Sequence, residues 1–370
     1  MVPVKSGRVR LGAIISLQPI FMRIRRTFPV VLAVVIIAGA VVVAVQLRKH
    51  APPEPARLLP GADGFLYADY SWVRRTNGKS FIPVNHEPEY EQFIQETGFD
   101  YERDLDSVAF AIHYPERWPG GGTGGIAPEP RFSEVFNGRF DVNRCTAYFR
   151  RIAKAVETYN SVDIYTIPIY GRSFRIAILG VDSVAASNHD DPAVIRGMVD
   201  RSRRLASPFG GPALLRRYYK RVQLASPVWL VAHVEPSSPQ FSGWTNFLPH
   251  SADIVISASF NPLHLPFRAG ALHLRAEAWT ANEDDARTIA DKTNVFLSML
   301  HGAEASVGSP GTEAELKVLF DSLQVKQESN RAVLVATVPT EVLHKIAGSP
   351  EQVPALAPAP PDTPATEKKR

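Results

Sequence analysis

A stretch of uncharged residues, 28–47, dominates the pattern of apolar and polar positions, and it consists mainly of Val, Ile and Ala. At ~1.5 Å of rise per residue, a helix of this length spans roughly 30 Å, which matches the hydrocarbon core of a bilayer. The pattern therefore predicts one transmembrane helix. The alternatives are a buried helix of a soluble domain, which would normally keep a polar face, and a cleaved signal peptide, whose apolar core is normally only ~7 to 15 residues long.

The charges around this stretch predict its orientation. No acidic residue precedes it, and the basic residues ahead of it are Lys5, Arg8, Arg10, Arg23, Arg25 and Arg26. Because cationic flanks stay in the cytoplasm, we expect residues 1–27 to lie inside the cytoplasmic (inner) membrane and the C-terminal domain to lie outside it, in a periplasmic or extracellular space. Arg23, Arg25 and Arg26 follow Met22, so a chain that started at Met22 would still have a basic segment ahead of the helix. Residues 1–21 therefore either belong to the mature protein or extend a chain that starts at Met22.

Alternating and helical patterns follow one another in the first half of the remaining chain. Strands are predicted at 64–71, 107–113, 133–140, 163–168, 174–179 and 183–187, and helices at 88–96, after Asp141 or Asn143, and after Asp191. Asp141 or Asn143 should act as an N-cap, since short polar side chains accept hydrogen bonds from the first free N–H groups of a helix. Asp191 should cap the third helix, with Pro192 in its first turn.

The second half repeats this order loosely. Strands are predicted at 228–234, 253–260 and 271–280 and in a hairpin around residues 329–330, with helices at 283–300, after a capping-box pattern at 312–315, and at 340–347. Asn282 should cap the long helix. The strand at 271–280 alternates clearly, with His273, Arg275, Glu277 and Trp279 on one face and Leu272, Leu274, Ala276 and Ala278 on the other.

These elements predict an α+β fold in which antiparallel sheets carry helices packed on one face. Each half follows the order strand, helix, two strands, helix, two strands, helix, which indicates either a duplicated unit or one continuous domain. The expected segments are a basic cytoplasmic segment 1–27, the transmembrane helix 28–47, a Pro-rich linker 48–62, a first half 63–222, a second half 223–348 and a disordered Pro-rich tail 349–370.

The charge of the chain changes this picture in one respect. Its formal net charge is +4, but residues 1–50 hold eight of the 41 Lys and Arg residues and none of the 37 Asp and Glu residues. The rest of the chain is therefore slightly acidic, and we expect no nucleic-acid partner. Cys145 is the only cysteine, which excludes an intramolecular disulfide, and its place in a predicted helix favours a buried thiol over an intermolecular bridge.

Common catalytic patterns do not assemble in the sequence. The ten histidines form no HExxH motif or close pair, and the alternating acids Asp100, Glu102, Asp104 and Asp106 lack the glycine and distal glutamate of a calcium loop. The sequence neighbours His250, Ser251 and Asp253 are not a triad by adjacency alone. The glycines at 120, 122 and 125 match GxGxxG formally but are flanked by prolines. We therefore expect no cofactor, no metal and no catalytic residues recognisable from sequence.

One charged region is a candidate binding surface. Only Asp200 offsets the basic residues between positions 196 and 221, which are Arg196, Arg201, Arg203, Arg204, Arg216, Arg217, Lys220 and Arg221. In an otherwise slightly acidic domain they are expected either to form a patch that contacts an anionic lipid, a cell-wall polymer or an acidic envelope protein, or to be a solvated helix face followed by a loop.

Three stretches, LLPGADGFLYADY, FSEVFNGRFDVNR and DIYTIPIYGRSFRIAILGVDSVAASN, resemble an uncharacterised family of bacterial single-pass membrane proteins with an α+β extracytoplasmic domain. The resemblance covers residues 58–204 best and implies a location and a fold, with no catalytic residues. The sequence thus favours a membrane-anchored binding or scaffolding protein of the cell envelope. An envelope hydrolase with a site assembled only in three dimensions, and a subunit of a larger membrane complex, remain alternatives, and the oligomeric state stays open.

Overall fold

The computed structural model describes a large part of the chain beyond residue 50. The described residues are 51–71, 74, 88–114, 130–169, 171–203, 211–224, 226–237, 243, 246–260, 271–306, 314–339 and 342. The chain divides into two compact units, Met1–Ala51 and Pro52–Arg370, and the described helices and strands belong to the second. Outside the described residues lie the predicted segments 1–27 and 28–47, the glycine motif at 120–125, Arg204, nearly all of the predicted helix 340–347 and the tail 349–370. No helix of the described ranges is both long enough and apolar enough to cross a bilayer.

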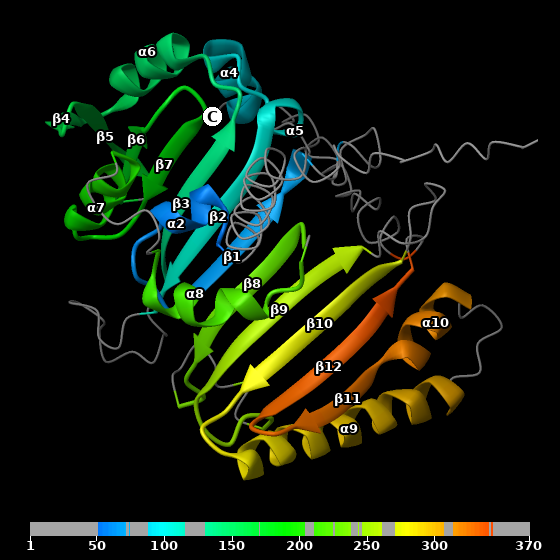
Figure 1. Cartoon of the computed structure of the whole chain (residues 1–370). Coiled ribbons are helices and arrows are strands. Elements are labelled where there is room, and N and C mark those ends of the chain that lie inside the picture. Colours follow the sequence, from blue (N-terminus) through cyan, green and yellow to red (C-terminus); the bar gives the residue numbers. More distant parts are fainter. Residues whose placement is uncertain are drawn as a thin grey trace, which may run out of the picture. The chain divides into compact units, whose positions relative to one another are not determined.

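A single antiparallel sheet organises the second unit (Figure 1). Its strand order is β11-β12-β10-β9-β8-β1-β2-β3-β7-β6-β5-β4. The strands are β1 Gly64–Asp69, β2 Leu105–His113, β3 Arg131–Gly138, β4 Ala155–Tyr159, β5 Val162–Ile169, β6 Arg172–Ile178, β7 Ser183–Ser187, β8 Val228–Val234, β9 Ala252–Phe260, β10 Leu272–Trp279, β11 Gln324–Glu328 and β12 Arg331–Val338. The predicted class, α+β with antiparallel strands, is confirmed, but the strands form one continuous sheet instead of separate sheets.

The connections of the two halves follow the same scheme on either side of the central pair β1 and β8. β1–β2–β3 and β8–β9–β10 are both three-strand meanders. In each half the strand beside the meander is the last strand of that half, β7 beside β3 and β12 beside β10. β1 and β8 pair antiparallel, with Leu66 opposite Leu230 at the middle of their register.

Helices cover both faces of this sheet. They are α2 Glu54–Leu58, α4 Pro88–Thr97, α5 Tyr101–Asp104, α6 Val142–Ile152, α7 Ala193–Ser202, α8 Ala213–Tyr218, the 3₁₀ helix η1 Tyr219–Arg221, α9 Glu283–Ser306 and α10 Ala314–Ser322. Ile164 packs in a core cluster with α2, α7 and α8, whereas its neighbour Tyr165 packs in another cluster with α6. Consecutive strand residues point to opposite faces, so α6 and α7 lie on opposite faces. The prediction of helices on one face is therefore wrong.

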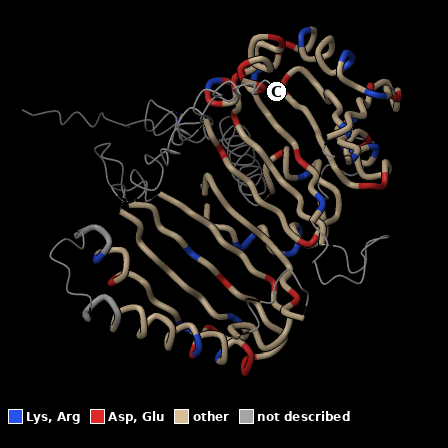
Figure 2. The backbone as a smooth tube through the Cα atoms, turned by 180° about the vertical axis from the view of Figure 1, so that it is seen from behind, with Lys and Arg blue, Asp and Glu red and all other residues tan. Residues whose placement is uncertain are grey.

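The position of α9 follows from the same alternation of side chains. Val255 of β9 belongs to the cluster with α2, α7 and α8, whereas Ile254 packs against Ile289 and Ala290 of α9. α9 thus lies on the same face as α6, at the opposite end of the sheet (Figure 1). Figure 2 shows Lys, Arg, Asp and Glu mainly on helices and near strand ends, so that much of the described sheet carries uncharged residues.

Several helix boundaries follow the expected capping. The Asp141 side chain accepts a hydrogen bond from Arg144 N and is the N-cap of α6. Asn282 Oδ1 accepts one from the backbone N–H of Asp285 at 2.8 Å in the first turn of α9. Asp191 Oδ1 accepts one from a backbone N–H of the first turn of α7 at 2.8 Å, although the N-cap position itself is taken by Pro192.

The predicted Pro-rich linker contains structure that the sequence did not indicate. Residues 54–58 form α2, and Ala56 and Leu59 are 0% and 1% exposed in the largest core cluster. Burial of these apolar side chains holds a helix too short to be stable alone. Residues 52–62 of the predicted linker are therefore an integral part of the folded unit.

Candidate anion-binding surface

The predicted basic patch divides into two parts, and the α7 part is occupied by structural contacts. Arg196 forms an ion pair with Glu157 of β4, with 2.7 Å between Nη2 and Oε1. Arg201 Nε donates a hydrogen bond to the carbonyl oxygen of Leu58 at 2.7 Å, and burial lowers the pKa of its guanidinium. Arg203 donates to a backbone carbonyl oxygen of the β4–β5 turn. These arginines therefore brace α7 against its neighbours.

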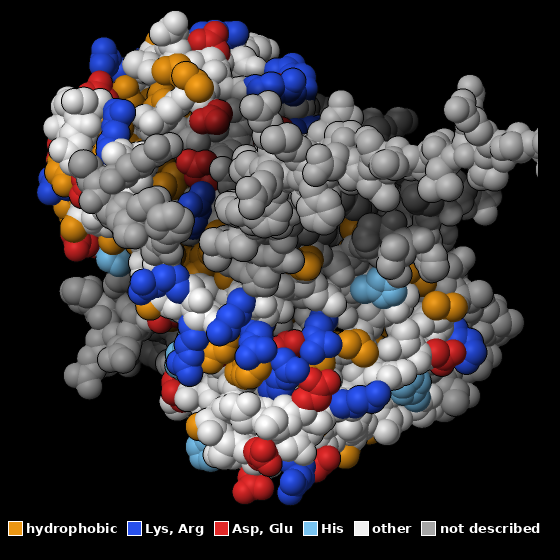
Figure 3. Space-filling model, viewed as in Figure 1, with side chains coloured by type: hydrophobic (Ala, Val, Ile, Leu, Met, Phe, Trp, Pro, Cys, Tyr) orange, Lys and Arg blue, Asp and Glu red, His pale blue; other side chains and the backbone are white. Residues whose placement is uncertain are grey.

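The other part lies on α8 and η1 and faces outward. Leu215 and Tyr218 are buried, at 0% and 6% exposure, because their side chains point from α8 into the main core. Tyr219 is half-buried against the same core. The four exposed residues between positions 215 and 221 are all basic: Arg216, Arg217, Lys220 and Arg221. We call these four residues the α8 cations. Figure 3 shows Lys and Arg side chains gathered on this side of the molecule, in the region where Figure 1 labels α8.

Two of the α8 cations rest on aromatic rings. The guanidinium carbon of Arg217 lies 5.2 Å from the ring centroid of Tyr218, and that of Arg221 lies 4.4 Å from the centroid of Trp279 in β10. The Tyr218 and Trp279 rings are themselves 6.1 Å apart. None of the α8 cations has a hydrogen bond or an ion pair with another residue of the described part of the chain. Within the described ranges, no carboxylate therefore forms an ion pair with these four cations.

The buried carboxylate of Glu277 holds the indole of Trp279 in place through a hydrogen bond. Glu277 is 4% exposed, and its Oε2 accepts hydrogen bonds from Trp279 Nε1 at 2.9 Å and from Arg331 Nη1 of β12 at 3.0 Å. Its Oε1 accepts one from Arg275 Nε at 2.6 Å. A buried charge is tolerated when several donors satisfy it, so Glu277 and its three donors form a satisfied network that fixes the indole ring.

The sequence pattern did not reveal this half of the surface. The prediction that Arg275, Glu277 and Trp279 share a strand face is confirmed, but nothing linked that face to the basic run 60 residues earlier. Arg331 comes from β12, which pairs with β10 so that Arg331 stands opposite Trp279. The alternation at 272–279, with three charged or aromatic side chains on one face, was the signal that could have pointed here.

The sequence neighbours His250, Ser251 and Asp253 do not form a triad. His250 Nδ1 lies 2.9 Å from Asp285 of α9, whereas Asp253 Oδ1 lies 2.7 Å from Nδ1 of His233 on β8. The two His–Asp pairs are therefore separate contacts that tie strands and helices together. Asp253 also acts on Tyr218 of α8: burial, and then Asp253, raises the pKa of the Tyr218 hydroxyl to about 12, so this hydroxyl stays protonated near neutral pH.

A histidine–serine cluster lies in the other half of the sheet, on β2, β3 and β7. His113 Nε2 is 3.1 Å from Ser133 Oγ, which in turn is 3.0 Å from Ser187 Oγ. Ser133 and Ser187 are 0% and 2% exposed. A hydroxyl that no substrate can reach is not a nucleophile, so we assign this cluster to the packing of β2, β3 and β7.

The alternating acids at 100–106 serve local structure. Asp100 Oδ1 accepts a hydrogen bond from Glu102 N as the N-cap of α5. Asp104, which is 6% exposed, forms ion pairs with Arg103 and Arg139. Across the described residues, no three His, Cys, Asp or Glu side chains come together as metal ligands would.

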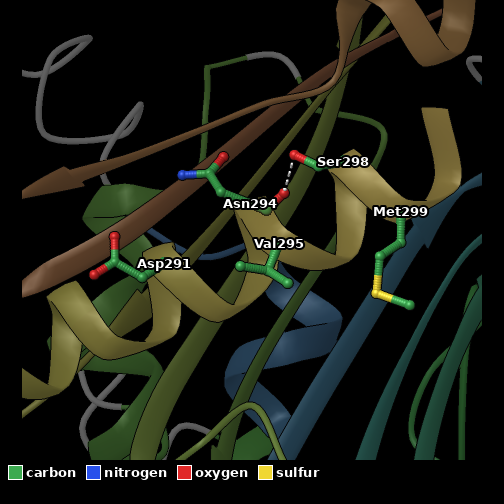
Figure 4. A pocket seen from close by; sticks show the side chains of 5 residues that line it. All are labelled: Asp291, Asn294, Val295, Ser298 and Met299. Atoms are coloured by element: carbon green, nitrogen blue, oxygen red, sulfur yellow. Dashed lines mark hydrogen bonds between the residues drawn. The ribbon is translucent and has the colours of Figure 1, made fainter. Parts of the chain in front are cut away.

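A hollow along α9 offers little chemistry. Its described lining consists of Asp291, Asn294, Val295, Ser298 and Met299 (Figure 4). Ser298 Oγ donates to the backbone carbonyl oxygen of Asn294 at 2.9 Å, which leaves one carboxylate and one amide beside exposed Val295 and Met299. No pair of groups suited to acid–base catalysis meets there among these five side chains.

Comparisons with known proteins give no family. No family model matches the chain, and no curated protein matches it. Three solved structures show a distant likeness: crystal form I of TP0453, with 12% identity and a TM-score of 0.39 over 81% of this chain and 98% of that one, and crystal forms III and IV, with 11% and 10% identity and TM-scores of 0.37 and 0.36 over 80% and 82% of this chain and 99% of each of those. Likeness at this level carries no argument about function.

Proposed function

We propose that this chain is a single-pass membrane protein whose extracytoplasmic domain binds an anionic component of the cell envelope through the α8 cations. The anchor is residues 28–47, with the basic segment 1–27 inside the inner membrane and the domain outside it. The apolar stretch and its charge asymmetry in the sequence support this placement. A scaffolding role, in which the same surface holds an acidic envelope protein, uses the same contacts.

The observation that carries the proposal is the contrast between the two parts of the basic run. The α7 arginines have carboxylate or carbonyl partners, whereas the α8 cations have no hydrogen-bond or ion-pair partner in the described structure. Each Lys or Arg near an anionic membrane surface contributes ~1 kcal/mol to binding, so four contribute roughly 4 kcal/mol, or about a thousandfold in affinity. Salt weakens such contacts, because exposed charges are screened over roughly 8 to 10 Å.

Vesicle flotation tests the proposal. The full chain, held in nanodiscs of neutral lipid, is mixed with neutral vesicles or with vesicles that contain phosphatidylglycerol. Arg216→Glu with Arg217→Glu should lower the affinity for the anionic vesicles by roughly 30-fold or more, which corresponds to the loss of about 2 kcal/mol of binding free energy. Arg287→Glu with Lys292→Glu makes the same charge change on exposed α9 positions and should have little effect. Binding that neither the α8 substitution nor added salt changes would refute the proposal.

A second candidate role is favoured by a separate observation. On α9, Val295, Phe296 and Met299 are 61%, 45% and 68% exposed, and neighbouring apolar side chains at this exposure are typical of protein contact surfaces. This supports the role of a subunit in a larger membrane complex. Cross-linking in native membranes should then capture a partner from α9, and replacement of Val295 and Met299 by Ser should abolish the cross-link; a partner whose capture does not depend on these positions would argue against α9 as the contact.

We also infer that the two halves of the sheet are copies of one ancestral unit. The shared order of meander, helices and returning strands supports this inference, as does the antiparallel pairing of β1 with β8 at the junction. Sequence profiles built separately for residues 63–222 and 223–348 should align β1–β3 with β8–β10. An alignment in any other register would contradict the duplication.

A further inference from the structure

The α8 cations differ in how firmly they are held, and this difference points to a more specific site. Arg216 and Lys220 make no hydrogen bond, ion pair or ring contact with another described residue, whereas Arg217 and Arg221 each lie on an aromatic ring. A guanidinium stacked on a ring loses little further freedom when it binds, and its N–H edge stays available, because the ring takes up only its face.

The ring beneath Arg221 is itself fixed. Trp279 donates its indole N–H to Glu277, which is held by Arg275 and Arg331. The guanidinium carbon of Arg331 also lies 4.8 Å from the Trp279 centroid, but its Nη1 and Nη2 are engaged by Glu277 and Glu328. Arg331 therefore supports the ring, while Arg221 retains its donors for a ligand.

Charge and geometry together select the ligand. Two stacked guanidiniums with Lys220 and Arg216 beside them present more positive charge than a single carboxylate can neutralise. A phosphate group carries up to two negative charges and several acceptor oxygens, and Arg binds it through two parallel N–H···O bonds. Glu277 is already saturated by its three donors, so it does not compete for Arg221.

We infer that Arg221 on Trp279 and Arg217 on Tyr218 form a phosphate-binding site, with Lys220 and Arg216 at its edge. This inference rests on the proposed function and names its ligand chemistry: a phosphate monoester, or adjacent phosphates of a chain. The phosphate comes either from a lipid headgroup or from a soluble or polymeric phosphate. Arg221 is the principal ligand, and Glu277 is a positioning residue that acts through the indole.

A charge-conserving substitution separates this site from diffuse attraction. Arg221→Lys keeps the positive charge but removes the planar fork and its stacking on Trp279, so affinity for inorganic pyrophosphate should fall at least tenfold. Lys292→Arg, on the exposed side of α9, is the matched control and should leave the affinity unchanged. Pyrophosphate binding to the full chain is followed by calorimetry and by the tryptophan emission that Trp279→Phe removes. Near-UV circular dichroism of the buried Trp229 checks that each variant is folded.

The source of the phosphate is resolved in parallel arms. Wild-type protein and Arg221→Lys are compared with pyrophosphate, with a short polyphosphate and with vesicles that contain phosphatidic acid, and citrate serves as the carboxylate comparison. A tenfold loss only with vesicles assigns the site to lipid, and a loss with the soluble probes assigns it to soluble or polymeric phosphate. Equal binding of wild-type and Arg221→Lys to every phosphate probe, or equal affinity for citrate and pyrophosphate, overturns the inference. If anionic vesicles still require Arg216 and Arg217 in that case, the proposed function stands without the phosphate site.

Discussion

Two half-buried titratable side chains should give this domain opposing responses to pH. Glu134 of β3 lies between Phe110 of β2 and Ala186 of β7 in the register of the sheet, and no hydrogen bond or ion pair links it to another described residue. Burial raises the pKa of its carboxyl from 4.5 to about 7. On β2, burial and then the neighbouring His189 lower the pKa of His113 from 6.5 to about 4, against an opposing effect of Asp63.

The sign of each contribution follows from which state holds the proton. Glu134 keeps its proton longer in the folded state, so its contribution to stability is complete below pH 4.5 and is lost as the pH rises to about 7. His113 gains its proton later in the folded state, so its contribution is complete above pH 6.5 and is lost as the pH falls to about 4. Each shift corresponds to about 3 kcal/mol at most, and to less where water reaches the group. Between pH 4.5 and 6.5 the two slopes have opposite signs and largely cancel.

Substitution of one group should expose the slope of the other. Glu134→Gln keeps the side-chain shape and removes the ionisation, so it should raise the free energy of unfolding by about 2 to 3 kcal/mol at pH 8 relative to wild type, and by much less at pH 4.5. His113→Gln should make the free energy of unfolding fall as the pH rises from 4.5 to 7. Urea unfolding of the detergent-purified chain, followed by tryptophan fluorescence across this range, gives both differences.

Matched variants decide whether burial is the cause. Glu89→Gln removes a carboxyl from an exposed position on α4, where water solvates the charge, and should change the unfolding free energy little. A difference between Glu134→Gln and wild type that is independent of pH would show that Glu134 has an ordinary pKa. Burial without a partner would then not control the ionisation of this carboxyl.

Two further predictions concern close packing. Cys145 is 2% exposed and burial raises the pKa of its thiol to about 11, so at pH 8 it should not react with a disulfide reagent until the chain is unfolded; rapid stoichiometric labelling of the native protein would contradict this. Gly138→Ala should lower the free energy of unfolding by about 1 to 3 kcal/mol, because the new Cβ would stand 2.4 Å from the carbonyl oxygen of Asp104. Gly61→Ala, with open space around it, should lower this free energy little. Equal effects of the two substitutions in thermal or urea unfolding would disprove the close contact.

The elements that the sequence predicted well are those with a strong local signal. The alternation of β10 follows from its residues alone, because every second side chain must face the same side. The caps Asp141 and Asn282 are equally local. α2 and β4 were missed for the opposite reason: α2 has only five residues beside three prolines, and β4 is a mostly exposed edge strand that continues directly from a predicted helix. Burial against the core and pairing with β5, both long-range effects, decide these two elements.

The basic run shows why a charge pattern alone cannot define a binding site. Arg196 and Arg201 looked equivalent to Arg217 and Arg221, but their partners lie on β4 and at the C-terminal end of α2, far from them in the sequence. Whether a cation is neutralised depends on which distant strand passes beside it. Arg221, by contrast, lies over an indole whose N–H is already satisfied by a buried carboxylate, and no described residue accepts a hydrogen bond from its guanidinium. A surface cation therefore becomes a candidate ligand only when the fold has both positioned it and left its N–H donors unpaired, and among the described residues Arg221 meets both conditions.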